Sequence, residues 1–450
     1  MGRVTVVKSL AVSKLIHLFS IVDDLAPEFV KQIHDMFQEF VWNGKKSRIK
    51  YNYGVNLIED GGLGLPDIRI ISMALKCTWI KRSFSTGTGW QRLFELQYDN
   101  PKYIWSLDPK SLKILSVNTE NMFWKKVFLE WAVFTDKYMD ESANILKSYS
   151  IWNSYYVKHK PICLLKKRLC QRGVFTVGNL FHNNEFYSLR EFNDTFNAAI
   201  NFLDFESLKA CIPKHWVRII TSGTIPDPVT YISMVDKIIQ TAKLCKFINS
   251  YILSRSKNHR TVHETKWEVC LGLTFPRETW SLLYILPKRV TINSTLISFQ
   301  FKISHRLLIT NKTLKLWNIK LNDDCSFCHD HVETIDHLLA DCVHTHSLWQ
   351  ALAHWLQPEL DIREILIKKN ILLGYMGGQD SDILINKLIL LTKRFIYVQR
   401  CFEKQLYLAQ LLAFLCLQMK VEVKVSDKLL LDHHFKIWGP ISQKLLSINN

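Results

Sequence analysis

The sequence has little that points to secretion or to a membrane. Its first residues show no charged-then-apolar leader ending in a small-residue cleavage site. The 11 cysteines are an odd number, and outside residues 325–342 they show no disulfide-framework spacing. The most apolar stretch, Gln405 to Met419, is shorter than the roughly 20 residues that a membrane-spanning helix needs. We therefore expect no transmembrane segment, no membrane partner, and a reducing cytoplasmic and nuclear location.

Motifs for nucleotide chemistry are also missing. Gly44-Lys45 is not a phosphate-binding loop, because Glu39 stands where the first glycine belongs and Lys46 replaces the Ser or Thr that would hold magnesium. Residues 61–64 are glycine-rich, but Asp67 occupies the third glycine position of a dinucleotide fingerprint. We expect no small-molecule substrate.

Acidic residues are in deficit. Lys and Arg number 58 against 41 Asp and Glu, a difference of 58 − 41 = 17, and 48% of the residues are apolar. The chain should be folded for most of its length and should favour a polyanionic partner, RNA or DNA contacted through its phosphate backbone. An acidic membrane surface, or merely a solvated basic face, is the alternative interpretation.

Two stretches concentrate the positive charge. One follows a predicted helix that ends at residue 42, and the other surrounds Tyr155 and Tyr156. Aromatic residues between 85 and 150 keep helical spacing and are predicted to be core rather than base-stacking platforms. The candidate nucleic-acid contacts are Lys45, Lys46, Arg48, Lys50, Lys158, Lys160, Lys166, Lys167, Arg168, Lys302 and Arg306.

One cluster carries metal-ligand spacing. The pattern Cys-x2-Cys-x8-His-x4-Cys is formed by Cys325, Cys328, His337 and Cys342. Three thiolates and an imidazole make a closed tetrahedral zinc site, which leaves no position for an activated water and therefore predicts a structural role. The cluster could instead be ordinary core. Spacing alone also leaves four other histidines in competition with His337: His329, His331, His344 and His346.

Helical periodicity dominates the rest of the chain. Pro27 can open a helix whose apolar residues fall on one face until Asn43-Gly44 stops it. Near residues 382–400, Lys387, Lys393 and Arg394 are expected outside the apolar stripe. Helices are predicted at 27–42, 189–196, 205–210, 234–254, 344–356, 382–400 and 403–420. The predicted fold class is mainly α, a multi-subdomain helical protein with a small zinc-stabilised loop-helix unit.

Several motifs in a shared order carry a family resemblance. The chain resembles the segment just downstream of the polymerase palm in second-reading-frame proteins of LINE-type (non-LTR) retrotransposons. The resemblance covers nearly the whole chain and is thin at 85–170 and 218–265. Its main motifs are Gly2-Arg3-Val4, Phe40-Val-Trp42-Asn43-Gly44-Lys45-Lys46, Gly61-Gly62-Leu63-Gly64-Leu65-Pro66-Asp67, Ile212-Pro213-Lys214-His215-Trp216, the Cys/His cluster and Lys393-Arg394-Phe395.

The resemblance implies a reverse transcriptase-related protein that contacts template RNA or target DNA. In that family an endonuclease and the fingers and palm would lie upstream of Met1. The nearest match to the catalytic aromatic-x-Asp-Asp hairpin is Tyr138-Met139-Asp140-Glu141, which has glutamate in the last position and a polar, helix-like context. We therefore predict no catalytic residue in this chain.

We expect five segments, with a boundary at the Gly/Pro-rich stretch 222–228. They are a thumb-like segment at 1–84, a helical connector at 85–221, a helical region at 229–320, the Cys/His unit at 321–357 and C-terminal helices at 358–450. Three functions remain open: a non-catalytic, zinc-stabilised nucleic-acid-binding remnant, an accessory part of an active RNA-directed DNA polymerase, and a structural or unselected fragment without activity.

Overall fold

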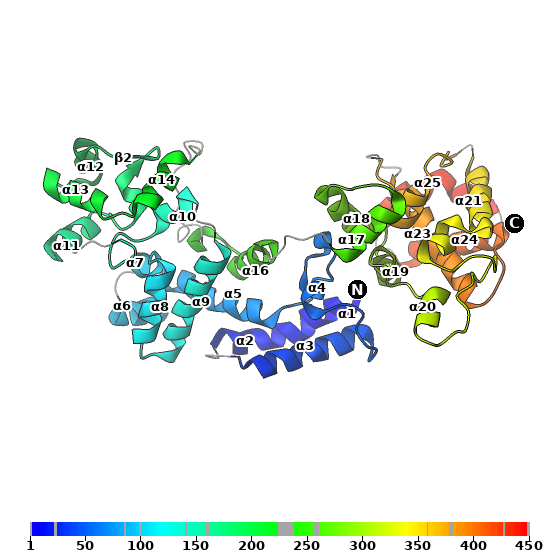
Figure 1. The fold of residues 1–450 in the computed structure, drawn as a ribbon, viewed down its shortest axis with the longest axis horizontal. Helices are drawn as coiled ribbons and strands as arrows, with labels where there is room; N and C mark the ends of the chain where they lie inside the picture. The colour runs from blue at the N-terminus through cyan, green and yellow to red at the C-terminus, as the bar shows by residue number, and fades with distance from the viewer. Residues whose placement is uncertain are drawn as a thin grey trace. The chain divides into compact units, whose positions relative to one another are not determined.

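A computed structural model describes residues 2–21, 25–84, 87–98, 101–139, 142–157, 163–223, 238–255, 261–357, 359–377, 382–425 and 428–447. These residues are predominantly helical (Figure 1). The only strands among them, β1 (Phe181–His182) and β2 (Glu185–Phe186), pair antiparallel. The predicted mainly α fold class is confirmed.

The chain forms two compact units. Unit 1 comprises Met1–Val6, Gln38–Leu65 and His259–Asn450, and unit 2 comprises Val7–Phe37 and Pro66–Asn258. Each unit therefore combines segments that are far apart in sequence. This division is coarser than the five predicted segments, which stay a prediction. Most of the predicted linker at 222–228 lies outside the described residues.

Unit 2 has a core rich in aromatic rings. Phe94, Trp124 and Phe128 are buried, and the ring centroids of Phe94 and Trp124 lie 4.9 Å apart, edge to face. Most aromatic residues of this region therefore pack as core, as their spacing predicts, whereas Trp90 is 50% exposed. The elements that begin in this unit are η1 (Val7–Val12), α2 (Ser13–Ile21), α3 (Pro27–Trp42), α5 (Ile68–Ser83), α6 (Gly89–Gln97), α7 (Pro101–Trp105), α8 (Pro109–Asn118), α9 (Met122–Tyr138), α10 (Ala143–Ser148), α11 (Cys163–Gln171), η3 (Val177–Leu180), α12 (Leu189–Phe196), α13 (Phe202–Ala210), α14 (Lys214–Ser222) and α16 (Leu244–Arg255).

Unit 1 has a separate core centred on α23 (Asp382–Cys401). Residues 384–393 of this helix are buried without interruption, because α18, α19, α24 and α25 surround it. The elements of this unit are α1 (Gly2–Val6), α4 (Tyr51–Val55), η2 (Ile58–Asp60), α17 (Val262–Leu271), α18 (Arg277–Val290), α19 (Ser294–Ser304), α20 (Asn311–Leu316), η4 (His337–Asp341), α21 (Val343–Leu356), α22 (Lys368–Leu373), α23, α24 (Leu408–Val425) and α25 (Lys428–Leu446).

Local sequence signals place several helices correctly. α3 ends where Asn43 and Gly44 adopt φ angles of 58° and 70°, so this pair stops the helix as predicted. At α12, Ser188 and Glu191 form the reciprocal hydrogen bonds of a capping box. α21 and α23 lie within a residue of the predicted bounds.

The prediction of one long helix over 234–254 is wrong. Within its described part the helix is interrupted at residues 241–243, and α16 begins at Leu244. At the interruption, the carbonyl of Thr241 accepts a hydrogen bond from Lys81 Nζ at 2.9 Å. A partner that is distant in sequence satisfies this carbonyl, so periodicity within the segment could not reveal the break.

One stretch of the described residues, Gly2–Ile21, has the length and apolarity of a membrane-spanning helix. Its mean hydropathy is 1.5, and 22% of the 18-residue window is buried. The expectation that no segment could span a membrane overlooked this stretch. Length and composition alone are weak evidence, because core helices and signal sequences have the same properties. The expected lack of a membrane partner stays a prediction.

Two lysines of α23 contradict the expectation that they lie outside the apolar stripe. Lys387 and Lys393 are 4% and 1% exposed. Lys387 Nζ forms an ion pair with Glu422 at 2.6 Å. Lys393 Nζ has neutral partners, because it donates to Gln300 Oε1 at 2.6 Å and to the Leu372 carbonyl at 3.2 Å. Burial therefore lowers the pKa of Lys393 to about 7.

Lys393 should make the stability of unit 1 depend on pH. Between about pH 7 and pH 10 the folded protein binds fewer protons at this side chain than the unfolded chain does, so stability should rise with pH by up to about 1.4 kcal/mol per unit. We expect Lys393→Met to remove that rise. Urea unfolding of the wild-type protein and the variant at pH 7, 8 and 9 measures this rise. If the free energy of unfolding changed with pH equally in both proteins, the lowered pKa could not belong to Lys393.

Candidate metal centre

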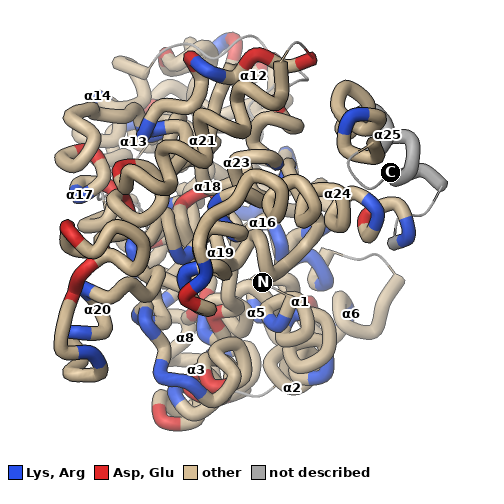
Figure 2. The backbone as a smooth tube through the Cα atoms, turned by 90° about the vertical axis from the view of Figure 1, so that its right-hand side faces the viewer, with Lys and Arg blue, Asp and Glu red and all other residues tan. Residues whose placement is uncertain are grey.

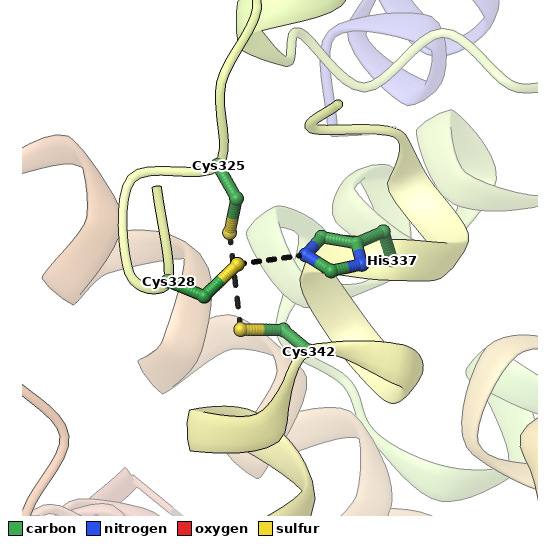
Figure 3. A group of neighbouring side chains, drawn as sticks. All are labelled: Cys325, Cys328, His337 and Cys342. Atoms are coloured by element: carbon green, nitrogen blue, oxygen red, sulfur yellow. Dashed lines mark hydrogen bonds between the residues drawn. The ribbon is translucent and has the colours of Figure 1, made fainter. Parts of the chain in front are cut away.

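A tight turn carries the first two cysteines. Cys325 N–H donates to the His331 carbonyl at 2.8 Å, and His329 N–H donates to the Cys325 carbonyl at 3.0 Å. His329 has a φ of 59°, in the left-handed region, and this conformation reverses the chain after Cys328. The two sulfurs consequently point toward one centre (Figure 3).

A π-helical turn presents the other two side chains. Five residues of an α-helix would place His337 and Cys342 about 140° apart around the axis. Instead, Cys342 N–H donates to the carbonyl of His337 at 2.8 Å, which is the wider i to i+5 pattern of η4. The wider turn brings His337 and Cys342 to the same side, facing the two cysteines of the loop (Figure 3).

The four side chains fit one zinc ion. Their ligand atoms all lie within 4.8 Å of one another. Cys325 Sγ and Cys342 Sγ are 3.8 Å apart, and Cys328 Sγ and His337 Nε2 are 3.4 Å apart. Zn–S bonds of about 2.3 Å and a Zn–N bond of about 2.0–2.1 Å at tetrahedral angles require separations of about 3.8 Å and 3.5 Å. Zinc held here would have four protein ligands and would supply structure.

Hydrogen bonds stabilise negative charge on the sulfur of Cys342. The Cys325 thiol donates to Cys342 Sγ, which raises the pKa of Cys325 and lowers the pKa of Cys342. Cys342 is the N-cap of α21, and the amides of His344 and Thr345 donate to its sulfur, which also favours the thiolate. Burial, followed by the nearby His331, lowers the pKa of His337. A neutral imidazole and thiolates are the forms that bind metal.

The geometry decides between the competing histidines. His337 belongs to the cluster, whereas the other four side chains are exposed. His331 lies against His337, with ring centroids 5.3 Å apart, and His346 contacts Gln350 at 3.1 Å. The predicted set of Cys325, Cys328, His337 and Cys342 is thus the set that the fold brings together.

A comparison with protein families adds an independent finding. Residues 276–349 match the family described as zinc-binding in reverse transcriptase. These residues form a zinc-binding domain of the reverse transcriptase-related kind. The domain runs from the start of α18 to the middle of α21, so it contains the Cys/His cluster and the three helices before it, α18, α19 and α20. The family and the donor geometry together support the zinc prediction.

We call residues 323–334, which carry Cys325 and Cys328, the metal-binding loop. A buried ion pair holds this loop against α23. Arg400 Nη2 lies 2.7 Å from Glu333 Oε1, and the two side chains are 8% and 0% exposed. Glu333 also accepts from Ser326 and from the Asn311 amide. Burial raises the pKa of Glu333, but the hydrogen bonds from Arg400 and Ser326 outweigh it and hold the pKa below its usual value. The sequence analysis missed this pair, because its members are 67 residues apart.

The predicted nucleic-acid contacts fall into three groups. Lys45, Lys46, Arg48 and Lys50 are exposed residues of unit 1 in the loop after α3. Lys166, Lys167 and Arg168 lie on α11 of unit 2, whereas Lys158 and Lys160 lie outside the described residues. Arg306 is engaged within the protein, because it pairs with Asp336 at 3.4 Å and its guanidinium lies 4.1 Å from the centroid of the Trp267 ring.

Lys302 lies in a concentration of positive charge. Its pKa is lowered by burial and then by the charges of Arg48, Arg394 and Lys45. We call these four residues the basic cluster: Lys45, Arg48, Lys302 and Arg394. They come from the loop after α3, from α19 and from α23. Arg394 was not among the predicted contacts, since its own segment gave no sign that it would meet Lys302.

Proposed function

We propose that unit 1 binds RNA or DNA through the phosphate backbone, as a non-catalytic part of a LINE-type reverse transcriptase protein. The observation that carries the proposal is the basic cluster. The charges of Lys45, Arg48 and Arg394, which come from the loop after α3 and from α23, oppose protonation of Lys302 on α19, and a bound polyanion would relieve that repulsion. The net charge of +17 favours the same partner.

Zinc would also hold a second basic segment of unit 1 in place. The metal-binding loop is hydrogen-bonded to α20, where Asn311 Nδ2 donates to the Asp324 carbonyl at 2.7 Å and to Ser326 Oγ at 3.1 Å. α20 and the turn after it add Lys312, Lys315 and Lys320, and basic positions recur along this segment in Figure 2. Closure of the loop by zinc would therefore fix a second row of cations in the same unit.

The order of motifs from Gly2 to Lys393 supports the LINE-type origin. A protein of this origin would meet template RNA in the cytoplasm and target DNA in the nucleus, and both locations are part of the proposal. The accessory-polymerase and inactive-fragment alternatives differ from it in measurable ways: primer extension by the purified chain would favour the first, and bound zinc without any nucleic-acid binding would favour the second.

Salt dependence tests the proposal. We expect Kd for a 20-nucleotide RNA to rise steeply between 50 and 200 mM salt, with a log-log slope of about 0.7 for each phosphate neutralised. Lys45→Gln combined with Arg394→Gln should weaken binding and lower the slope by about 1.4. Fluorescence anisotropy at four salt concentrations measures both quantities.

A matched control separates this surface from net charge. Lys113 of unit 2 is ion-paired with Asp136 at 2.6 Å, so Lys113→Gln removes a cation without touching the basic cluster. It should leave the slope unchanged. Equal effects of the control and the double variant would assign binding to overall charge, and a slope near zero for the wild-type protein would overturn the proposal.

A further inference from the structure

A rigid, exposed turn follows α20. The N–H of Trp317 donates to the carbonyl of Thr313, the N–H of Ile319 donates to the carbonyl of Leu314, and Asn318 reverses the chain with a φ of 56°. We call residues 316–321 the Trp317 turn. Trp317 is 46% exposed, and three neighbouring side chains are more exposed still: Leu316, Ile319 and Leu321. So much apolar area at the surface of one short turn suggests contact with a partner.

The indole of Trp317 is joined to the basic cluster. The guanidinium carbon of Arg48 lies 5.1 Å from the centroid of the Trp317 ring. Arg48 is itself fixed, because its Nη1 donates to the carbonyl of Leu307 at 2.8 Å. An exposed aromatic ring therefore stands beside Arg48, a member of the basic cluster, and Arg48 is itself anchored to the backbone at Leu307.

This combination matches the chemistry of unpaired nucleic acid. Phosphates need cations, whereas an unpaired base needs a planar apolar face on which to stack. A duplex offers phosphates, but its bases are stacked inside and are not available to an aromatic ring. An anionic membrane would also attract cations and exposed apolar side chains, so binding to anionic vesicles is one outcome of the test below.

We propose that Trp317 stacks an unpaired base while the basic cluster contacts the neighbouring phosphates, so that unit 1 prefers single-stranded RNA or DNA to duplex. This inference rests on the proposed function and specifies its ligand. Arg48 has two roles in it, since it orients the indole and adds positive charge. The hydrogen bonds of α20 to the metal-binding loop keep the platform in place before the ligand arrives, which limits the entropy lost on binding.

Abasic oligonucleotides separate stacking from phosphate contact. A 20-nucleotide single strand and the same strand with abasic sugars at every position carry equal phosphate charge, but only the first has bases. We expect the wild-type protein to bind the normal strand between about 5 and 100 times more tightly than the abasic one. Trp317→Ala should bring the two Kd values together, whereas Trp317→Tyr should retain most of the difference. Anisotropy at one salt concentration gives all the Kd values.

The control is Leu321→Ala, which removes an apolar side chain of the same turn that is 95% exposed. It should leave the preference for bases intact. A preference that survives in Trp317→Ala, or that Leu321→Ala abolishes equally, would overturn the stacking role while salt-sensitive binding still upholds the proposed function. Loss of binding to anionic vesicles in Trp317→Ala, with the base preference unchanged, would assign the turn to a membrane and overturn the inference.

Discussion

Cys325→Ser should release zinc and unfold much of unit 1. The purified wild-type protein is expected to carry one tightly bound zinc, and the variant none. Structural zinc contributes about 10–16 kcal/mol of binding free energy in isolated zinc fingers. The larger core of unit 1 retains part of the fold without metal, so we expect a loss on the order of 5 kcal/mol or more. Metal analysis and thermal unfolding of the same samples measure the two effects.

The size of this effect follows from what the metal joins. Without zinc, the loop that carries Cys325 and Cys328 loses its link to the π-turn of His337, and three thiol groups and an imidazole are left facing one another. The N-terminus of α21 begins at Cys342, so the disturbance extends into the helix whose Leu348 and Leu352 belong to the core.

Two comparisons isolate the metal. Cys401 is an exposed thiol of unit 1 outside the cluster, and Cys401→Ser should keep both zinc and stability. Treatment of the wild-type protein with a strong chelator should reproduce the loss seen in Cys325→Ser. A chelated, metal-free wild-type protein that melts at the same temperature as the untreated wild-type protein would contradict a structural zinc site and reduce the cluster to packed core.

The ligand set could be predicted because the information lies within 18 residues. Two cysteines separated by two residues can reach one ion from almost any tight turn, and a histidine and a cysteine further on complete the set. The choice between His337 and its neighbours could not be made in this way. It depends on the π-turn from His337 to Asp341, and regular helical periodicity gives no sign of such a turn.

Helix positions could be predicted where capping residues mark the helix ends. Which side chains of a helix are buried could not be predicted in the same way. Periodicity in α23 placed Lys387 and Lys393 outside the apolar stripe, on the assumption that one face of the helix meets water. The helix is surrounded instead, and the two lysines find Glu422 and Gln300 as partners. A helix at the centre of a unit has no solvent face, and only the tertiary structure shows which helix takes that place.

The basic cluster illustrates the same limit for function. The sequence predicted Lys45 and Arg48 as nucleic-acid contacts from a run of positive charge, and it also gave Lys302 as a candidate contact. Their meeting with Arg394 depends on long-range packing, as does the contact of Arg48 with Trp317. Sequence patterns therefore identified several residues of the basic cluster, but they did not reveal that these residues come together.

Breaking the buried pair of Glu333 and Arg400 should have the second-largest effect. Arg400→Met leaves the Glu333 carboxylate buried without its cation, and we expect a loss of about 3–5 kcal/mol in the free energy of unfolding. The loss should appear in urea unfolding of the zinc-loaded protein. It should be accompanied by weaker zinc retention, because Glu333 also holds Ser326 within the metal-binding loop.

The double variant Glu333→Leu/Arg400→Met distinguishes pairing from desolvation. Both charges leave the interior together, so part of the loss should be recovered even though the loop has lost its hydrogen bonds to the carboxylate. The Lys315 and Asp323 pair is the control, since it joins the same loop to α20 but keeps contact with solvent, with side chains 50% and 24% exposed, and Lys315→Met should change stability little. A double variant as unstable as the sum of the single ones would show that Glu333 acts through Ser326 and Asn311 rather than through Arg400.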